Sequence, residues 1–478
     1  MKEKIDIQRI IDSPSESGGV YFIGIGGIGM SNLARYFHAK GVPVSGYDKT
    51  PTELTKELEQ SGIKIHYEEN VDLAPKNPDL VVFTPAVPKD HAELVFYQEN
   101  GFLVVKRSDV LGAITRESFN ICIAGTHGKT TITTMIGHIL RHTGYGCNAF
   151  LGGISVNYGT NFWSSENNVC VVEADEYDRS FLKLSPDIAV ITSMDADHLD
   201  IYGDEASLQQ TFVEFGNRVK EGGLLVGKFG LSKLKEVTVR NKISYSLQNG
   251  SADVFASDIQ IQNGGYKYNV LWNGGGLNDV ELRIGGMHNV ENSVAAMAIA
   301  NYLKIDGEKI KEAVKAFKGV KRRFEYIIAP EVHQEGAYRY PVFIDDYAHH
   351  PEELKALLKS ARSLFPQRKI TVIFQPHLYT RTRDFAEGFA RSLSLADEVV
   401  LLPIYPAREL PIEGVNSEMI LADIDIEHKS IVKKEDVVSW MEQYVKTLNK
   451  EFGEVIITAG AGDIDTLVQP LKKIIEQA

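Results

Sequence analysis

Two glycine-rich turns, each set between a short apolar run and a helix-like apolar pattern, place the strongest constraint on the fold. The first turn has the spacing Gly24-x-Gly26-x-x-Gly29 and follows an apolar run that begins at Val20. The second turn, residues 125–131, follows the apolar run of residues 119–124. A strand joined to a helix through a glycine turn is the unit of a doubly wound parallel sheet, so we expect an α/β protein.

Further apolar runs extend this pattern along all 478 residues, a length that suits about three domains. The runs predicted to be strands are 42–47, 79–88 and 102–111 in the first sheet, 168–176 and 186–200 in the second, and 342–346, 370–374, 398–404 and 454–460 in the third. Residues 244–285 alternate apolar positions with turn signals, which predicts a small antiparallel insertion. We therefore predict three domains, at residues 1–117, 118–321 and 322–478.

The composition narrows the class of protein. With 51 Lys and Arg against 64 Asp and Glu, the formal charge is −13, so we expect no general binding of nucleic acid or anionic membrane. The three cysteines, Cys122, Cys147 and Cys170, match no zinc or disulfide spacing, which suits a reducing compartment. The sequence shows neither the apolar core of a signal peptide nor a run of about 18 apolar residues. We expect a soluble, cytoplasmic protein.

The first glycine turn has the features of a diphosphate site. Glycines allow the backbone to approach the ligand closely, and the start of the following helix offers free N–H groups to phosphate oxygens. Asp48, nineteen residues after Gly29, could accept hydrogen bonds from a ribose. The residues alone leave open whether the ligand is NAD, another diphosphate, or no ligand at all.

The second glycine turn reads Gly125-Thr126-His127-Gly128-Lys129-Thr130-Thr131 and predicts an ATP site. Its backbone N–H groups can surround phosphates, Lys129 can reach the β- and γ-phosphates, and the Thr130 hydroxyl can bind Mg²⁺. The turn is shorter than the usual phosphate loop, because Ile123 stands where the first glycine would be.

Acidic residues follow two predicted strands of the second sheet. They form the segments Glu173-Ala174-Asp175-Glu176 and Asp195-Ala196-Asp197-His198-Leu199-Asp200. The carboxyl ends of parallel strands meet where ligands bind, and Mg²⁺ prefers oxygen ligands, so these segments predict a site for Mg²⁺ or Mn²⁺. His198 could serve a second metal position or contact a substrate, and solvated loop charges are the alternative for any single carboxylate.

The last third of the chain carries two further polar segments at strand ends, residues 345–351 and 375–383. In the second segment, His377 lies close to Arg381 and Arg383. Guanidinium groups bind carboxylates through two parallel hydrogen bonds, which suits a substrate carboxylate. Arg322, at the predicted join between domains, is a candidate phosphate ligand. Solvated loops are again the alternative.

These segments, together with residues 287–292, occur in the order found in the Mur ligases, and the chain resembles that family from about residue 18 to 465. It is most similar to the branch that adds L-alanine to UDP-N-acetylmuramate in peptidoglycan synthesis for the bacterial cell wall. At Tyr177, however, the sequence resembles the branch that recycles murein tripeptide, and that activity is the alternative interpretation within the family. The resemblance implies a Rossmann-like domain for the UDP-sugar, a central P-loop ATPase domain and a Rossmann-like domain for the amino acid.

The resemblance also implies roles for particular residues. Gly24, Gly26, Gly27, Gly29 and Asp48 would bind the UDP-sugar. The ATP-binding set would be Gly125, Thr126, His127, Gly128, Lys129, Thr130, Thr131, His288, Asn289, Asn292, Arg322, Asp345 and Asp346. Metal would be bound by Thr130, Glu173 and His198, and the amino acid by His377, Arg381 and Arg383, with His349 close by. The carbamoylated lysine of several Mur ligases has no equivalent around Gln209.

The reaction that the resemblance implies begins when ATP phosphorylates the lactyl carboxylate of UDP-N-acetylmuramate. The amine of L-alanine then displaces phosphate from the acyl phosphate, so no enzyme nucleophile is required. Lys129 would neutralise the transferred phosphoryl group, and His198 or His349 could accept the amine proton near neutral pH. The predicted partners are thus ATP, UDP-N-acetylmuramate and L-alanine, for a monomer or homodimer. An NAD-linked oxidoreductase and a non-catalytic ATP-dependent switch are the alternatives from other classes.

Overall fold

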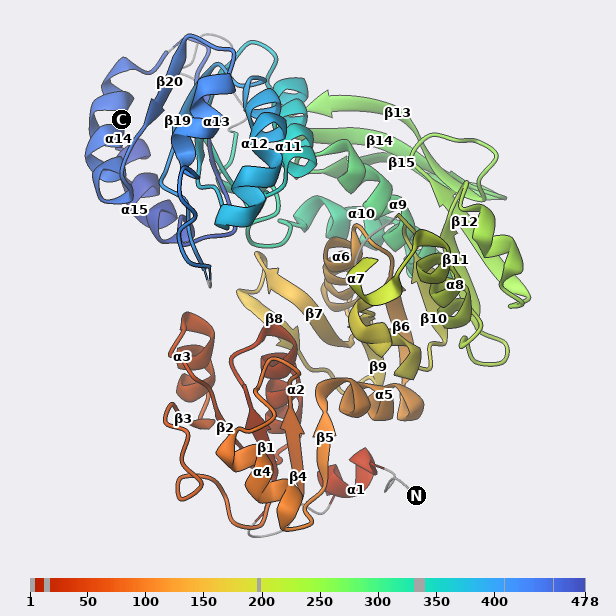
Figure 1. The fold of residues 1–478 in the computed structure, drawn as a ribbon. Helices are drawn as coiled ribbons and strands as arrows, with labels where there is room; N and C mark the ends of the chain where they lie inside the picture. Colours follow the sequence, from red (N-terminus) through yellow and green to blue (C-terminus); the bar gives the residue numbers. More distant parts are fainter. Residues whose placement is uncertain are drawn as a thin grey trace. The chain divides into compact units, whose positions relative to one another are not determined.

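The computed structural model describes residues 5–12, 18–195, 199–330, 340–407, 409–449 and 451–477. These residues form three sheets, with strand orders β3-β2-β1-β4-β5, β15-β14-β13-β12-β11-β10-β6-β9-β7-β8 and β16-β17-β21-β18-β19-β20 (Figure 1). The chain divides into two compact units. The first comprises residues up to 255 with 271–276 and 291–313, and the second comprises the intervening segments and residues from 314 onward.

The first sheet is fully parallel and buried on both faces. Its strands are β3 (Lys64–His66), β2 (Val44–Tyr47), β1 (Val20–Ile23), β4 (Leu80–Phe83) and β5 (Val104–Lys106). Val20 and Phe22 pack against α2 (Ile28–Ala39), whereas Tyr21 and Ile23 face the core that includes Leu94 and Tyr97 of α4 (Ala92–Glu99). Alternate residues of one strand thus serve two cores, as in a doubly wound sheet. The predicted fold class is confirmed here.

The predicted strand at residues 102–111 is wrong in its second half. Strand β5 ends at Lys106, and α5 (Arg107–Glu117) begins with the next residue. The backbone N–H of Lys106 donates to the Asp109 carboxylate at 3.2 Å, a contact that caps the helix start. Since Val110, Ala113 and Ile114 are buried at helical spacing, the apolar residues after Arg107 belong to a helix.

In the second sheet, the two strands with predicted acidic ends lie on either side of the strand that leads into the second glycine turn. Strand β6 (Phe119–Ala124) pairs in parallel with β9 (Val169–Glu173) and with β10 (Ile188–Ile191). Further strands and helices of this region include β7 (Asn148–Ser155), β8 (Thr160–Trp163), β11 (Leu224–Lys228), β12 (Asn241–Ser246), α6 (Lys129–His142), α7 (Leu199–Tyr202) and α8 (Glu205–Gly216). Helix α2 packs on β7 and β8, so the first two sheets share one apolar core within the first unit.

The predicted antiparallel insertion is present. Strands β13 (Val254–Gln262), β14 (Gly265–Trp272) and β15 (Gly275–Leu282) are neighbours in the sheet and are joined by two-residue turns. Such short connections require antiparallel strands. In the first turn, Asn263 and Gly264 both have positive φ, 51° and 70°, as a type I′ hairpin turn needs.

The third sheet lies in the second unit and is parallel except at one edge. Strand β16 (Glu325–Ile328) runs antiparallel to β17 (Val342–Asp346). The other strands are β21 (Glu454–Ala459), β18 (Lys369–Phe374), β19 (Glu398–Leu401) and β20 (His428–Ile431). Helices α14 (Val437–Tyr444) and α15 (Asp465–Ile475) cover one face (Figure 1). On the other face, the ring of Phe389 in α12 (Tyr379–Leu393) lies 5.4 Å from the ring of Phe374, measured between centroids.

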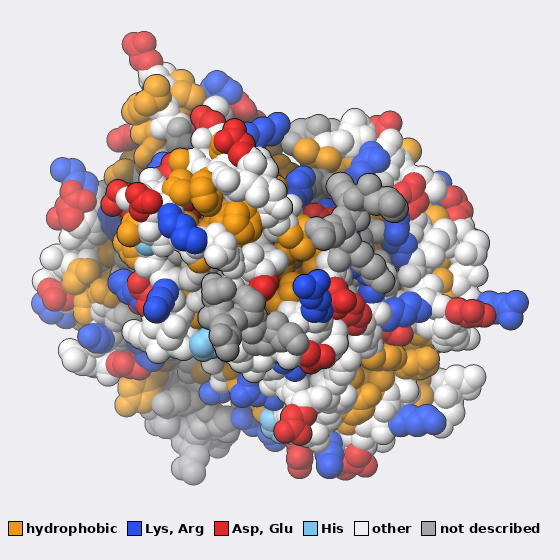
Figure 2. Space-filling view, turned by 90° about the horizontal axis from the view of Figure 1, so that it is seen from below, with side chains coloured by type: hydrophobic (Ala, Val, Ile, Leu, Met, Phe, Trp, Pro, Cys, Tyr) orange, Lys and Arg blue, Asp and Glu red, His pale blue; other side chains and the backbone are white. Residues whose placement is uncertain are grey.

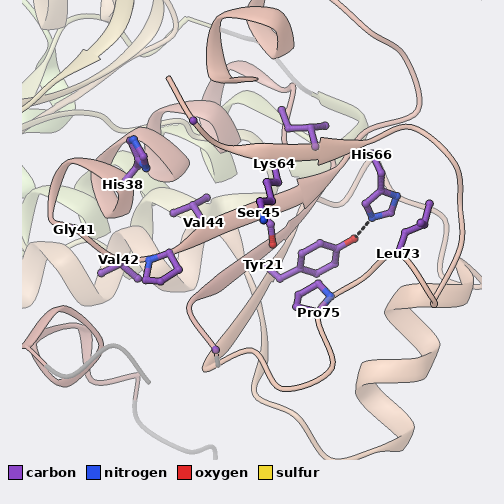
Figure 3. Close-up of a pocket in the computed structure, with 14 residues that line it drawn as sticks. Tyr21, His38, Gly41, Val42, Val44, Ser45, Lys64, His66, Leu73 and Pro75 are labelled. Carbon is purple, nitrogen blue, oxygen red and sulfur yellow. Dashed lines mark hydrogen bonds between the residues drawn. The ribbon is translucent and has the colours of Figure 1, made fainter. Parts of the chain in front are cut away.

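A buried polar network links three elements of the first sheet's domain. Tyr21 donates to the fully buried Glu93 carboxylate, which also accepts from the Asn70 N–H at 3.1 Å. The Tyr21 hydroxyl is also hydrogen-bonded to Nε2 of His66, 2.8 Å away; a dashed line marks this bond in Figure 3. Burial and the Glu93 carboxylate raise the pKa of Tyr21 well above its usual range. These contacts join β1, β3 and α4 beside a groove of about 630 Å³ that includes the amino ends of β1 and β2.

The described surface mixes charges of both signs. On the face seen in Figure 2, Lys and Arg side chains are interspersed with Asp and Glu side chains. Among the residues that the structure describes, no helix combines the length and apolar character needed to cross a membrane.

Candidate active site

The first glycine turn is held in place by backbone and carboxylate contacts. Gly24, with φ of 87°, and Ile25 both donate their N–H groups to the Tyr47 carbonyl, at 2.8 and 3.0 Å. The Gly26 N–H donates to Oδ2 of Asp48 at 2.7 Å, and Oδ1 of Asp48 accepts from the Thr50 N–H at 3.3 Å. The Asp48 carboxylate therefore fixes the turn. A ribose contact by Asp48 stays a prediction.

A pocket of about 330 Å³ connects this turn to the acidic end of β9. Its lining includes Gly27 and Gly29 from the turn, Arg107 from the start of α5, and Glu173 and Asp175 from the second sheet. A methyl group added at Gly29 would come within 2.6 Å of the Arg107 guanidinium, so arginine and glycine turn lie in direct contact. The sequence pattern does not single out Arg107, because the apolar run around it predicts a strand.

The second glycine turn has the backbone of a phosphate loop. Gly125 has φ of 132°, and a methyl group there would lie 2.0 Å from Oγ1 of Thr192. Gly128 has φ of 81° and directly precedes α6, whose first turn receives no side-chain cap. The Ser193 hydroxyl accepts from the His127 N–H and bonds the Thr126 hydroxyl, each at 2.8 Å. The loop is thus tied to the end of β10, and the uncapped start of α6 suits an anionic ligand.

Two carboxylates from the strand end after β9 contact the loop. The Lys129 ammonium lies 2.7 Å from Oε1 of Glu176 and 2.7 Å from the Gly125 carbonyl. The Thr130 hydroxyl donates to Oε1 of Glu173 at 3.2 Å. The structure therefore brings Lys129, Thr130 and Glu173 together, and it adds Glu176, to which the sequence analysis assigns no individual role.

The Thr130 and Glu173 pair fits a hard divalent cation. A hydroxyl oxygen and a carboxylate oxygen 3.2 Å apart are the donors that Mg²⁺ binds together with phosphates and water. The third predicted ligand, His198, lies outside the described residues. Among the described residues, no three His, Cys, Asp or Glu side chains form a preassembled metal site.

The predicted adenine-side residues belong to α9 (Met287–Tyr302). A methyl group at Gly128 would lie 2.9 Å from Oδ1 of Asn292, which places this amide beside the phosphate loop. Asn289 is buried and its amide donates to the Gly285 carbonyl at 2.6 Å. His288 precedes it, and its ring is close to Gly286. Asn292 thus meets the loop within the first unit, whereas His288 and Asn289 belong to the second.

Arg322 is already surrounded by acceptors in the second unit. Its Nε lies 3.4 Å from Oδ2 of Asp345 and its NH1 group 3.6 Å from Oδ2 of Asp465, and it also donates to the Gly460 carbonyl. The backbone of Arg322 has φ of 60°, a region that non-glycine residues seldom adopt. Burial raises the pKa of Asp345, while Thr458 and Arg322 act in the opposite direction.

Asp346 organises the turn around Arg322. Its carboxylate accepts from the Phe324 N–H at 2.6 Å and from the Ala348 N–H at 2.8 Å. Burial raises the pKa of Asp346 to about 6 despite these bonds. Both oxygens thus serve the backbone of this unit, and the ribose contact expected for Asp346 stays a prediction.

His349, His377 and Arg381 gather at the carboxyl ends of β17 and β18. The two imidazole rings are 6.2 Å apart, and Arg381 lies 3.5 Å from Nδ1 of His377. Burial and the Arg381 guanidinium lower the pKa of His377, and burial chiefly lowers that of His349. His349 directs Nδ1 at the Tyr347 carbonyl, 2.9 Å away, so in the neutral ring Nδ1 carries the proton and Nε2 the lone pair.

The contact of Arg383 lies outside this cluster. It lies on α12 two residues after Arg381, but its Nε donates to Oδ1 of Asp384 at 2.7 Å, and half of its side chain is exposed. Its predicted contact with an amino-acid carboxylate stays a prediction.

Gly128→Ala should abolish nucleotide binding, because its methyl group combines a left-handed backbone with a collision at the Asn292 amide. Gly144→Ala is the matched control, since Gly144 has φ of 78° and no atom of the described residues would lie within 4 Å of an added methyl group. Both variants should lose about 1–2 kcal/mol of stability from backbone strain. Calorimetric titration with ATP should separate them, and equal loss of ATP binding in both would contradict the role given to Gly128.

Three family models match consecutive parts of the chain. They are "Mur ligase family, catalytic domain" over residues 19–119, "Mur ligase middle domain" over 123–300 and "Mur ligase, glutamate ligase domain" over 322–462. Each match contains one of the three sheets or most of it.

Curated relatives match over nearly the full length. A UDP-N-acetylmuramate–L-alanine ligase of Porphyromonas gingivalis is 46% identical over 464 residues, covering 96% of this chain and 99% of that protein. The protein of the same name from Flavobacterium psychrophilum is 47% identical, with 96% and 98% covered.

Solved structures agree. The UDP-N-acetylmuramate–alanine ligase of Thermotoga maritima superposes with a TM-score of 0.76 at 28% identity, over 96% of this chain and 98% of that one. A murein peptide ligase of Psychrobacter arcticus, at 22% identity, shows the same fold with a TM-score of 0.64, over 96% and 99%. The chain belongs to the Mur ligase family.

Proposed function

We propose that this chain is an ATP-dependent ligase that joins L-alanine to the lactyl carboxylate of UDP-N-acetylmuramate, in the synthesis of peptidoglycan precursors. The observation that carries the proposal is the 330 Å³ pocket, which is lined by the first glycine turn and by Glu173 beside the phosphate loop. A nucleotide-sugar held by that turn would extend its carboxylate toward the γ-phosphate of ATP. The names of the curated relatives support the choice of substrates.

The first glycine turn and Arg107 would hold the diphosphate of the sugar nucleotide. Gly26 is fixed by Asp48, and the start of α2 carries no side-chain cap, so its N–H groups suit an anion. The Arg107 guanidinium lies against Gly29 and can add a charge-assisted contact to the same phosphates.

The second glycine turn would bind the triphosphate of ATP. Lys129 neutralises charge on the β- and γ-phosphates, and Asn292 borders the loop at Gly128. Thr130 and Glu173 would hold Mg²⁺, which when bound supplies further neutralisation of the transferred phosphoryl group. ADP and an acyl phosphate are the products of this first step.

The histidine and arginine cluster of the third sheet would receive the amino acid. Arg381 suits the carboxylate of L-alanine. Because the pKa of His349 is lowered by burial, its Nε2 is unprotonated at neutral pH and can accept the proton of the attacking amine. The three cysteines are buried, and burial raises the pKa of Cys170 to about 11, so a thiolate nucleophile is not favoured.

The domain joins near residues 117 and 321 and a cytoplasmic location belong to the same proposal. Nucleotide-sugars and ATP are cytoplasmic metabolites, and the mixed surface charge favours neither nucleic acid nor anionic membrane.

The test is phosphate release with Mg-ATP and UDP-N-acetylmuramate, with L-alanine or the L-alanine-containing murein tripeptide added in separate reactions. We expect release that depends on free L-alanine. Lys129→Ala should lower kcat by about 10²–10³-fold, since it removes charge stabilisation of the phosphoryl transfer, and should leave UDP-sugar binding nearly intact. Phosphate release with the tripeptide alone would favour the recycling reaction. If Lys129→Ala lost UDP-sugar binding to the same extent as turnover, the result would argue against separate sites for ATP and the UDP-sugar.

Arg107→Ala should raise the KM for UDP-N-acetylmuramate by roughly 10–100-fold, because it removes a charge-assisted contact to phosphate. The KM values for ATP and L-alanine should change little. Arg116→Ala, at the exposed end of the same helix, is the matched control. A larger effect on ATP than on the sugar nucleotide would reassign Arg107.

Arg381→Ala should raise the KM for L-alanine by roughly 10–100-fold through loss of the carboxylate contact. Arg391→Ala removes an exposed arginine of the same helix that pairs with Glu387, and should behave as the unsubstituted enzyme. Steady-state kinetics with each substrate varied in turn would show the pattern, and a selective rise for ATP would refute the assignment.

A further inference from the structure

The contact between Lys129 and Glu176 buries a carboxylate at a cost in solvation free energy. The Glu176 side chain is fully buried, and one of its oxygens lies 2.7 Å from the Lys129 ammonium; among the described residues, the other oxygen has no hydrogen-bond partner. A buried carboxylate with an unpaired oxygen loses solvation that a single ion pair does not restore. Burial raises the pKa of Glu176 although Lys129 lowers it, which agrees with incomplete compensation.

The hydrogen-bond capacity of Lys129 is limited. An ammonium group has three donors, and two of them are directed at the Gly125 carbonyl and at Glu176. A phosphate-loop lysine that bonds both the β- and the γ-phosphate needs two donors for the nucleotide. At least one present contact must therefore be given up when ATP binds.

The charge of Glu176 identifies the contact that opposes ATP. A triphosphate placed at the loop brings several negative charges close to a carboxylate that sits in a poorly solvated position. The Gly125 carbonyl carries no net charge and belongs to the loop itself. Repulsion and competition for the ammonium thus act together at Glu176.

We propose that Glu176 is a positioning residue that holds Lys129 in a resting arrangement and competes with the phosphates of ATP for its ammonium group. The proposal rests on the proposed role of residues 125–131 as the ATP phosphate loop. ATP binding then includes the transfer of Lys129 from Glu176 to the nucleotide, and the carboxylate recovers the lysine when the phosphates leave.

The backbone around Glu176 is fixed independently of its side chain. Its carbonyl accepts from the Tyr202 hydroxyl at 2.5 Å and from the Arg179 N–H at 2.9 Å, at the start of the 3₁₀ helix η1 (Tyr177–Lys183). Glu176→Gln keeps the size of the side chain and the contacts of the residue's carbonyl, removes the charge, and exchanges one acceptor oxygen for an amide NH2 group. This variant therefore isolates the competition.

The experiment is calorimetric titration of the full chain with Mg-ATP and, separately, with AMP, which lacks the phosphates that Lys129 would reach. Glu176→Gln should tighten ATP binding by roughly tenfold, within the usual range of coupling between two sites, and leave AMP binding unchanged. In the Lys129→Ala background, the same substitution should change ATP affinity little, because its effect acts through the lysine.

Asp187→Asn is the matched control. Asp187 pairs with Lys220 at 2.9 Å in the same domain, but it precedes β10, whereas the phosphate loop lies at the opposite ends of the strands. It should leave ATP affinity unchanged. Thermal unfolding of each variant checks that the fold is kept.

Several outcomes would overturn the proposal. Unchanged or weaker ATP binding in folded Glu176→Gln would show that the carboxylate supports the lysine instead of competing for it. Equal tightening in the Lys129→Ala background, or in Asp187→Asn, would show a general effect of charge. By contrast, ATP binding by Lys129→Ala as tight as that of the unsubstituted chain would remove the phosphate-loop assignment itself.

Discussion

The parallel pairing of β6 with β9 on one side and β10 on the other is the constraint on which the candidate phosphate site depends. In this register Ile123 lies opposite Glu173, and Ala124 lies opposite Ile191. The turn that begins at Gly125 therefore leaves the sheet between the ends of both neighbours, so close to Thr192 that only glycine fits. Because of this register, the hydroxyl groups that follow β10 and the carboxylates at the end of β9 reach the loop. A shift of the pairing by one residue would turn these side chains to the opposite face of the sheet.

The third sheet uses the same geometry. Strand β21 lies between β17 and β18, and Ala459 is opposite both Asp346 and Phe374. The segments that follow these three strands consequently meet at one edge, where Gln375 donates to Asp463 at 2.8 Å and Arg322 reaches the Gly460 carbonyl. Residues more than a hundred positions apart in the chain thus form one polar cluster, as ligand sites at the carboxyl ends of parallel strands generally do.

The sequence predicted strands and turns correctly where the underlying pattern is regular and local. The strand predicted at 342–346 has those bounds in the structure, and both glycine turns lie between the predicted strand and helix. It failed at residues 107–111, because the Asp109 contact that starts α5 is invisible in an apolar run. The residue pattern alone did not separate Glu173 from Glu176: the resemblance singled out Glu173, whereas the contact of Glu176 with Lys129 is visible only in the folded structure. Likewise, the backbone bonds of Asp48 and Asp346 depend on folded turns that no spacing encodes.

In both compact units, a cationic side chain of the candidate ATP-binding set is paired with carboxylates of the protein itself. Lys129 is held by Glu176, and Arg322 lies between Asp345 and Asp465. In this chain, whose net charge is −13, a polyanionic ligand at either cation would replace an internal carboxylate by its own phosphate oxygens. Such an exchange favours ligands that offer several oxygens in the right geometry, because a single inorganic anion gains too few contacts to offset a broken buried pair. Internal pairing of this kind would turn a general attraction for anions into selection for a triphosphate, and on the face seen in Figure 2 the positive side chains are interspersed with negative ones.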